Sequence, residues 1–202
     1  AANSIRELRL ASCRLGNAEA EELSVALKNS QTLQLLDLDN NLFSAEGLTS
    51  ICTMVQANPR IRNLSLWGNL ISGQIAKEFA AALKSNTYLK TLRINISSFD
   101  TEMEDLSGSL RTKQNLTDLH ILGKFSVESI RVLAALLSNN TYILSLSLVD
   151  AYLTDDGALA FATALKNNSS LTSLDLTKNS LETRGVEAIC QNLAGNTTLT
   201  QL

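Results

Sequence analysis

The residues of this chain best suited to nucleophilic or metal chemistry are three cysteines and one histidine, and their spacing favours neither use. Cys13, Cys52 and Cys190 lie far apart in the sequence, and none stands with another cysteine or with His120 at the spacing of a metal site. The carboxylates are scattered rather than paired, and no phosphate-binding loop occurs. We therefore expect no metal, no cofactor and no catalytic residue, and the chain is predicted not to be an enzyme.

Composition narrows the classes of partner. The 202 residues, 45% of them hydrophobic, are enough to form a sizeable core. A net charge of −3 weighs against nucleic acid or an anionic membrane surface as the main partner. No apolar run reaches the roughly 18–20 residues of a membrane span, and the first residues lack the pattern of a signal peptide. We expect no membrane insertion, and cysteines without an evident disulfide favour a reducing, cytoplasmic location.

The elements that must position any functional residue follow from a repeat. In the segment Leu171–Leu181, apolar residues stand at positions one, four, six and eleven, and an asparagine stands at position nine. The same template starts at residues 5, 33, 61, 89, 116, 143 and 171, and a partial copy starts at 199. A near-constant period of this length with this pattern is the mark of leucine-rich repeats. We expect a single repeat domain over residues 1–202. Because no capping repeat is visible at either end, we also expect a piece of a longer protein.

The aligned columns indicate the structure of each repeat. Positions one, four and six, such as Leu33, Leu36 and Leu38, predict a short strand with its apolar side chains turned inward. Apolar residues at positions 16, 19 and 23 form one buried helical face. Position twelve is often a hydroxyl residue that is suited to cap that helix, at Ser44, Ser72, Ser126 and Thr154.

Position 20 holds only small residues, as expected where a helix lies close to a sheet. Cys52 and Cys190 belong to this column and Cys13 stands at position nine, so we expect all three cysteines in the core. A disulfide between columns three or more repeats apart is implausible, because the Cα atoms of a disulfide lie within about 7 Å. The column reads Ser24, Cys52, Ala80, Ser107, Ala134, Ala162 and Cys190.

Two columns of asparagine suggest particular backbone roles. At position 26, as in Asn58, Asn86 and Asn168, asparagine is expected to end the helix in the left-handed conformation. Helix capping also explains several Asn-x-Ser/Thr sequons, for which glycosylation is the alternative. At position nine, the side chain is expected to bond turn backbone across neighbouring repeats. The fourth to sixth repeats lack this asparagine, which predicts altered turns there, through either relaxed drift or adaptation to a partner.

The repeat length, the full helix and the pattern L-x-x-L-x-L-x-x-N/C-x-L resemble the ribonuclease-inhibitor-like subclass of leucine-rich repeats. The helix ends at residues 164–171 (ALKNNSSL) and 82–89 (ALKSNTYL) are similar to those of NOD-like receptors, tropomodulins and some bacterial effectors. The resemblance implies an α/β solenoid, a horseshoe with a parallel sheet on its concave face and helices on its convex face. It also implies that the chain binds a partner protein.

Candidate binding residues lie at the strand positions that the core leaves free. Trp67, the only tryptophan, stands directly after an inward leucine and is a good anchor for a partner, although it could instead cover the rim of the sheet. His120 is expected to face the concavity beside Arg93 and Ser147. Free columns from the third to the sixth repeat carry an apolar strip that Phe99 could extend. The candidate contact residues are Trp67, Arg93, Ile96, His120, Leu122, Leu144, Val149, Tyr152 and Asp39.

Three functions remain open. The leading hypothesis is a module that binds another protein through the concave face and adjoining loops, in a NOD-like receptor or in a microbial effector that acts in the host cytosol. The alternatives are a GTPase-activating protein and an actin-capping domain of tropomodulin type. The predicted strand face is wide enough for a standard protein interface. Its basic and acidic residues are balanced, so we expect neither nucleic acid nor a small molecule as the ligand.

Overall fold

The chain alternates short strands with helices. The computed structural model describes residues 4–71, 73–96 and 100–202. The strands are β1 (Glu7–Arg9), β2 (Leu35–Asp37), β3 (Asn63–Ile71), β4 (Thr91–Ile96), β5 (Asp118–Leu122), β6 (Ser145–Ser147) and β7 (Ser173–Asp175). The helices are α1 (Asn17–Leu27), α2 (Ala45–Ala57), α3 (Gln74–Ser85), α4 (Asp100–Leu110), α5 (Val127–Ser138), α6 (Asp155–Asn167) and α7 (Thr183–Leu193).

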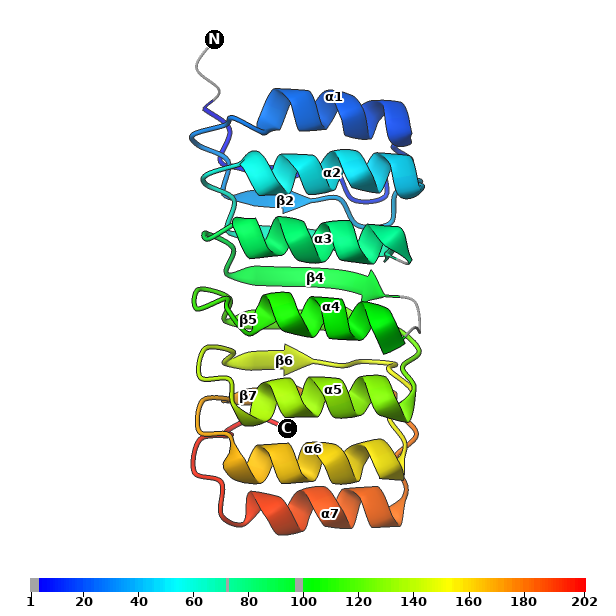
Figure 1. Cartoon of the computed structure of the whole chain (residues 1–202), viewed down its shortest axis with the longest axis vertical. Helices are drawn as coiled ribbons and strands as arrows, with labels where there is room; N and C mark the ends of the chain where they lie inside the picture. Colours follow the sequence, from blue (N-terminus) through cyan, green and yellow to red (C-terminus); the bar gives the residue numbers. More distant parts are fainter. Residues whose placement is uncertain (1–3, 72, 97–99) are drawn as a thin grey trace.

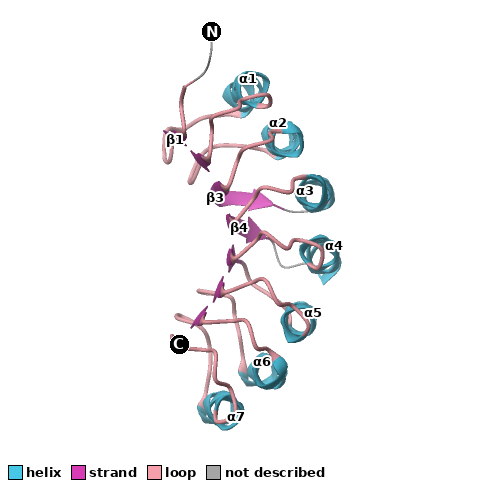
Figure 2. Ribbon diagram, turned by 90° about the vertical axis from the view of Figure 1, so that its left-hand side faces the viewer, coloured by secondary structure: helices cyan, strands magenta, loops and turns pink. Residues whose placement is uncertain are grey.

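The strands form one parallel sheet whose spatial order follows the sequence, from β1 to β7. Each pair is aligned so that equivalent repeat positions are opposite each other, as Leu8 is to Leu36 and Leu36 to Leu64. An isolated parallel bridge from Ser173 to Gln201 continues the sheet into the partial copy. The helices stack along the other side of the sheet (Figure 1), and the repeats follow an arc with the strands on its inner face and the helices outside (Figure 2). The predicted solenoid is confirmed.

The core lies between the sheet and the helices. Strand positions one, four and six fill it, and Leu33, Leu36 and Leu38 are each 0% exposed. The small column at position 20 is buried from α1 to α6, where each helix approaches the strands. The prediction of three core cysteines is right for Cys52 and wrong for the other two. Cys190 is exposed on α7 and Cys13 on the first turn, because neither has a further repeat packed against it in the described chain.

The helix starts differ from the predicted hydroxyl caps. Ser126 does cap α5, since its hydroxyl accepts the backbone N–H three residues later at 3.1 Å. Ser44 and Thr154 occupy the cap positions of α2 and α6 without such a bond, and Ser72 lies outside the described residues. At α2 the preceding repeat supplies the cap, because the side-chain oxygen of Asn17 accepts the N–H groups of Ser44 at 2.9 Å and of Gly47 at 3.2 Å.

The asparagines at position 26 are not left-handed, which corrects the prediction. Asn58, Asn86 and Asn168 have φ between −73° and −82° with extended ψ values. Each is buried, and its side chain joins two repeats. For Asn168, Nδ2 donates to the carbonyls of Leu137 at 2.7 Å and Asn140 at 3.0 Å. Its Oδ1 accepts the N–H groups of the residues two and three positions later, at 3.0 and 2.7 Å. The column is therefore kept for buried hydrogen bonds rather than for a special φ.

The fourth repeat replaces this asparagine by Lys113, and the substitution keeps one bond of the ladder. The side chain is buried, and its Nζ donates to the carbonyl of Asn86 in the preceding repeat. Burial lowers the pKa of Lys113 from its ordinary value. A single ammonium thus replaces the donor side of the amide, but it has no oxygen to accept the backbone N–H groups that follow.

The prediction of altered turns in the fourth to sixth repeats is wrong for the sixth repeat, where Asp150 has a φ of +53°, like Asn40 and Lys178 at the same position of regular turns. Position nine of the fourth repeat lies outside the described residues. Asn41 and Asn179 donate to carbonyls of their own and the preceding repeat. β3 and β4 instead run on for nine and six residues, where most other strands have three. Their pairing shifts register after Ser65, so that Leu70 and Ile71 are opposite Asn95 and Ile96. A bulge therefore interrupts the pairing of the third repeat with the fourth.

Candidate protein-binding surface

The concave face presents the outward residues of the strands in aligned rows. We call the row at position five the central row. Neighbouring strands lie about 4.8 Å apart, so adjacent side chains of a row are within reach of one another. From β1 to β7 the central row reads Arg9, Asp37, Ser65, Arg93, His120, Ser147 and Asp175.

Trp67 sits on the bulge that follows the regular part of β3, and it is half-buried. The guanidinium carbon of Arg93 lies 5.1 Å from the ring centroid, a cation–π contact. The backbone N–H of Trp67 donates to Asp39 Oδ1 at 2.7 Å, and the Ser65 hydroxyl donates to the same oxygen. Asp39 was predicted as a contact residue, and its carboxylate positions the Trp67 turn. The ring is held at the rim of the sheet with part of its surface in solvent.

Gly68 fixes the shape of this turn. Its φ is +77°, a conformation that residues with a Cβ rarely adopt. A Cβ at this position would lie 2.1 Å from Oδ1 of Asn40 on the preceding turn. The Gly68 N–H also donates to Oδ1 of Asn95 on β4 at 2.8 Å. The backbone next to Trp67 is therefore held from both neighbouring repeats, which limits the motion of the ring.

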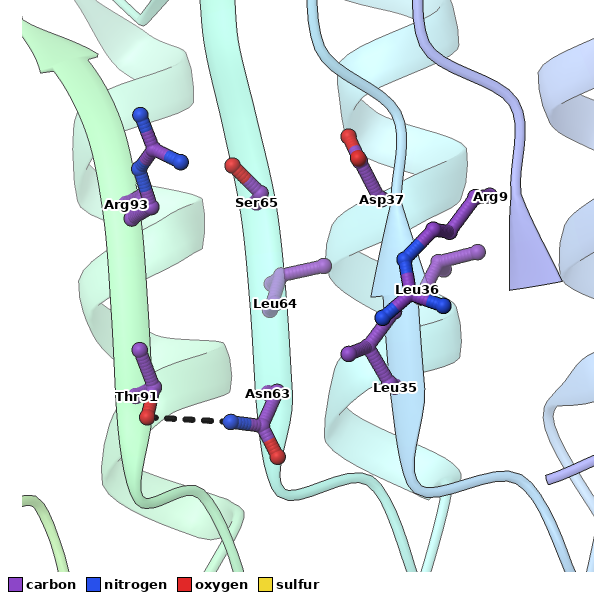
Figure 3. A pocket seen from close by; sticks show the side chains of 9 residues that line it. All are labelled: Arg9, Leu35, Leu36, Asp37, Asn63, Leu64, Ser65, Thr91 and Arg93. Carbon is purple, nitrogen blue, oxygen red and sulfur yellow. Dashed lines mark hydrogen bonds between the residues drawn. The ribbon is translucent and has the colours of Figure 1, made fainter. Parts of the chain in front are cut away.

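A shallow pocket of about 220 Å³ opens on the concave face between Arg9 and Arg93 (Figure 3). Asp37 and Ser65 of the central row lie between the two arginines, on neighbouring strands. Arg9 is paired with Glu7 on its own strand at 2.5 Å, and both side chains are more than half exposed, so the pair adds little stability. The remaining lining residues are Leu35, Leu36, Asn63, Leu64 and Thr91.

His120 faces the concavity opposite Arg93 and Ser147, as predicted. It is half-buried, and burial is the main reason that its pKa lies below the ordinary histidine value. The charge of Arg93 lowers the pKa further, while Asp118 and Asp175 act in the opposite direction. His120 is therefore mostly neutral near pH 7, and its protonation would place a second positive charge beside Arg93.

The predicted apolar strip is not continuous. Ile96 is only 3% exposed, which corrects its assignment to a free column. Because β4 continues beyond the regular strand length, the alternation of side chains carries Ile96 inward after Leu92 and Ile94. Leu122 and Val149 are half-buried near the C-terminal ends of β5 and β6. Leu144 is 42% exposed but precedes β6, so it lies at the opposite end of the strands.

Tyr152 is 49% exposed on the turn after β6, as predicted. Its φ is +56°, which places it among the left-handed turn residues of the described chain. The ammonium of Lys124, from the preceding repeat, lies 4.9 Å from the centre of its ring. A hydrogen bond with the Tyr152 hydroxyl raises the pKa of Lys124. Phe99, which was expected to extend this group, lies outside the described residues.

Lys124 is the neighbour that the sequence analysis missed. It stands at position nine, where the regular repeats carry asparagine, and this loss was interpreted only as an irregular turn. A basic residue one repeat before an aromatic turn residue is the signal that could have indicated the contact. The two cation–π pairs, Trp67 with Arg93 and Tyr152 with Lys124, both lie near the C-terminal ends of the strands.

The described residues present neither a cluster of metal ligands nor a membrane-spanning helix. Within 4–71, 73–96 and 100–202, no group of three or more histidine, cysteine, aspartate or glutamate side chains is placed to hold a metal ion. In the same part of the chain, no helix has the length and apolar character needed to cross a bilayer. All three cysteines are free thiols.

Known proteins resemble this chain through its repeats. A family model described as "Leucine Rich repeat" matches residues 29–52, 139–162 and 167–190. NACHT, LRR and PYD domains-containing protein 14 of Mus musculus is 30% identical over 157 residues, or 76% of this chain and 16% of that protein. Protein phosphatase 1 regulatory subunit 37 homolog of Caenorhabditis briggsae is 32% identical over 95 residues, or 45% of this chain and 10% of that protein.

The match to a solved structure of the leiomodin-1 actin-binding site 2 covers 95% of this chain and 80% of that chain, with 14% identity and a TM-score of 0.38. The chain spans only 16% or less of the length of the first curated relatives it matches. Each segment that the family model matches contains one strand and at least the first part of the helix that follows it. The chain is an array of leucine-rich repeats and is similar to the NACHT, LRR and PYD domains-containing proteins.

Proposed function

We propose that this chain is a non-enzymatic module that binds a partner protein through its concave face and the turns at the C-terminal ends of its strands. The observation that carries the proposal is Trp67, held on the rim by Asp39 and Gly68 and covered on one side by Arg93. A large aromatic ring with a fixed backbone loses little conformational freedom on binding, which is why such residues dominate interface energetics.

The similarity to NACHT, LRR and PYD proteins and to a phosphatase regulatory subunit supports a binding role. Regulatory subunits act on another protein, and we extend that role to this chain as part of the proposal. Its location is proposed to be cytoplasmic, in keeping with three free thiols. Nucleic acid and small molecules are not proposed as ligands. A GTPase-activating or actin-capping role would require a measured effect on GTP hydrolysis or on actin polymerisation.

Affinity capture from cell extract, with proteins identified by mass spectrometry, tests the proposal. Wild type is compared with Trp67→Ala and with Tyr88→Ala, an exposed aromatic residue (46%) just before β4, away from the Trp67 turn. We expect a protein retained by wild type and Tyr88→Ala and lost by Trp67→Ala, with a loss of affinity of about 2 kcal/mol or more. Equal recovery by all three would contradict the role assigned to Trp67.

A further inference from the structure

Charge is unevenly distributed along the concave face. The outward positions of β3 and β4, and of the residues just before them, hold Arg62, Lys90 and Arg93, and all three are exposed. Between residues 61 and 96 the printed sequence has one acidic residue, Glu78, and this lies on α3 on the convex side. We call these three basic residues the cationic cluster. Other carboxylates of the face lie on other strands, with Glu7 and Asp37 on β1 and β2 and with Asp118 and Asp175 on β5 and β7. The carboxylate nearest to Trp67, that of Asp39, already accepts hydrogen bonds from the Ser65 hydroxyl and the Trp67 N–H.

The cationic cluster has no acidic partner in the described part of the chain. The ion pairs there join Arg9 to Glu7, Arg131 to Glu128 and Arg184 to Asp156. The Arg93 guanidinium lies over Trp67, which fixes its position without using its hydrogen-bond donors. Among the described residues it donates no side-chain hydrogen bond, so its fork of N–H groups is free to bind an external acceptor.

The surface beneath the cationic cluster has room for a side chain. Ser65 lies opposite Arg93 in the register, and Asn63 donates to the Thr91 hydroxyl at 3.0 Å one row below. These short side chains form the floor of the pocket in Figure 3, and Arg93 stands at its edge. A group entering on the β4 side would meet small polar side chains below it and the Arg93 guanidinium beside it, while Asp37 and Arg9 line the other side of the pocket.

We propose that the occupant is an acidic segment of the partner protein, with a carboxylate held by Arg93 and further acidic residues facing Arg62 and Lys90. The proposal rests on the protein-binding function above and specifies the chemistry of its partner. Arginine and carboxylate match in geometry and form paired, charge-assisted hydrogen bonds. An apolar side chain next to the carboxylate would reach the part of the Trp67 ring that remains in solvent.

The arrangement favours a short acidic segment over a nucleic acid. The cluster spans two strands, or about 5 Å across the sheet, and carboxylates stand on the strands at both sides of it, Asp37 on β2 and Asp118 on β5. A phosphate backbone that continued beyond the cluster would meet both negative charges, whereas one carboxylate beside Arg93 is separated from Asp37 by the strand that carries Ser65. The overall charge of −3 adds long-range repulsion to any polyanion.

Selection from a display library of random peptides of about twelve residues on the full chain tests the proposal without a known partner. We expect enrichment of Asp and Glu in the selected peptides. A synthetic copy of one selected peptide should bind at least about tenfold more weakly to Arg62→Glu/Lys90→Glu, a variant that leaves Trp67 and Arg93 in place. Lys166→Glu, on the exposed surface of α6, is the matched control and should bind like wild type.

Replacing the acidic residues of that peptide by their amides separates charge from shape. Equal affinity of the acidic and amide peptides, or failure to enrich acidic peptides at all, would overturn the proposal. The proposal would also be overturned, in favour of nucleic acid, if single-stranded oligothymidine displaced the bound peptide at a lower concentration than free peptide does. Peptides that lose affinity with Trp67→Ala but not with Arg62→Glu/Lys90→Glu would refute the acidic partner and leave the proposed function intact. Circular dichroism melting of each variant monitors folding.

Discussion

The asparagine ladder at position 26 gives the sharpest prediction of stability. Asn168 is 5% exposed, and its side chain makes five hydrogen bonds. Nδ2 donates two, and Oδ1 accepts two backbone N–H groups and, at 3.4 Å, the Ser170 hydroxyl. Asn168→Ala removes all five and leaves buried carbonyl and N–H groups without partners. Since each unsatisfied buried group costs about 1–3 kcal/mol and water replaces some of the lost bonds, we expect a loss of about 3 kcal/mol. That loss corresponds to a fall of roughly 6–12 °C in the melting temperature.

Urea denaturation followed by circular dichroism measures the effect, and two further variants make the result decisive. Asn167→Ala changes the exposed neighbour at the end of α6 and should alter stability by less than about 0.5 kcal/mol. Asn168→Gly separates the two explanations of the column. A left-handed residue would tolerate or favour glycine, whereas the observed φ of −82° and the ladder predict a loss at least as large as that of alanine. Two results would refute the role of the ladder: an Asn168→Gly variant as stable to urea as wild type, or an Asn168→Ala variant that loses no more stability than Asn167→Ala.

The other predictions concern single side chains. Ser107→Leu should lower stability by about 1–3 kcal/mol in urea denaturation, because it overpacks the small column against the sheet. Burial raises the pKa of Cys52 to about 12, so iodoacetamide should modify the exposed Cys13 in the native protein and Cys52 only after unfolding, as mass spectrometry of peptides would show. The pKa of His120 is lowered by folding, so the unfolded chain takes up its proton first as the pH falls. Stability should therefore decrease from the ordinary histidine pKa of about 6.5 down to the folded pKa, and His120→Gln should remove this dependence from urea midpoints. Lys113→Asn should raise stability by about 0.5–1.5 kcal/mol, because an amide can both donate to the preceding repeat and accept the following N–H groups.

The sequence alone predicts the fold well because the core positions are sampled many times. The pattern at Leu33, Leu36 and Leu38 recurs in each repeat, so an accidental residue in one copy does not obscure the column. Because each column can be compared across the repeats, the sequence predicts the burial of the small column and of the inward strand residues. The same holds for the concave position of His120, which depends only on strand alternation.

Contacts between repeats were predicted less well, because they depend on which neighbour a side chain reaches. The helix cap from Asn17 to α2 joins residues 27 positions apart, and nothing in the local sequence distinguishes it from an ordinary cap at Ser44. The prediction for Asn168 concerned only the conformation of its own backbone, whereas its side-chain amide bonds the preceding repeat. Ile96 was misplaced because the prediction assumed a regular strand length in a repeat that lacks one residue.

The irregular region of the sheet and Trp67, the candidate anchor for a partner, are parts of one structural feature. At Ala151 the loss of the position-nine asparagine is compensated, since Asn179 of the next repeat accepts the N–H groups of Ala151 and Leu153. In the third repeat Asn69 keeps its bonds to the carbonyls of Leu38 at 2.9 Å and Leu66 at 3.2 Å. β3 and β4 nevertheless continue to pair beyond the usual length, and the extra residues form the bulge that carries Trp67. The extension that turns Ile96 into the core therefore also leaves Trp67 at the rim beneath Arg93. The left-handed φ of Gly68 belongs to the ordinary turn of the repeat, because Asn40, Asp150 and Lys178 share it at the same position. What distinguishes the Trp67 turn is the carboxylate of Asp39 in the preceding repeat, which accepts the Trp67 N–H at 2.7 Å and so ties the position of the ring to two repeats.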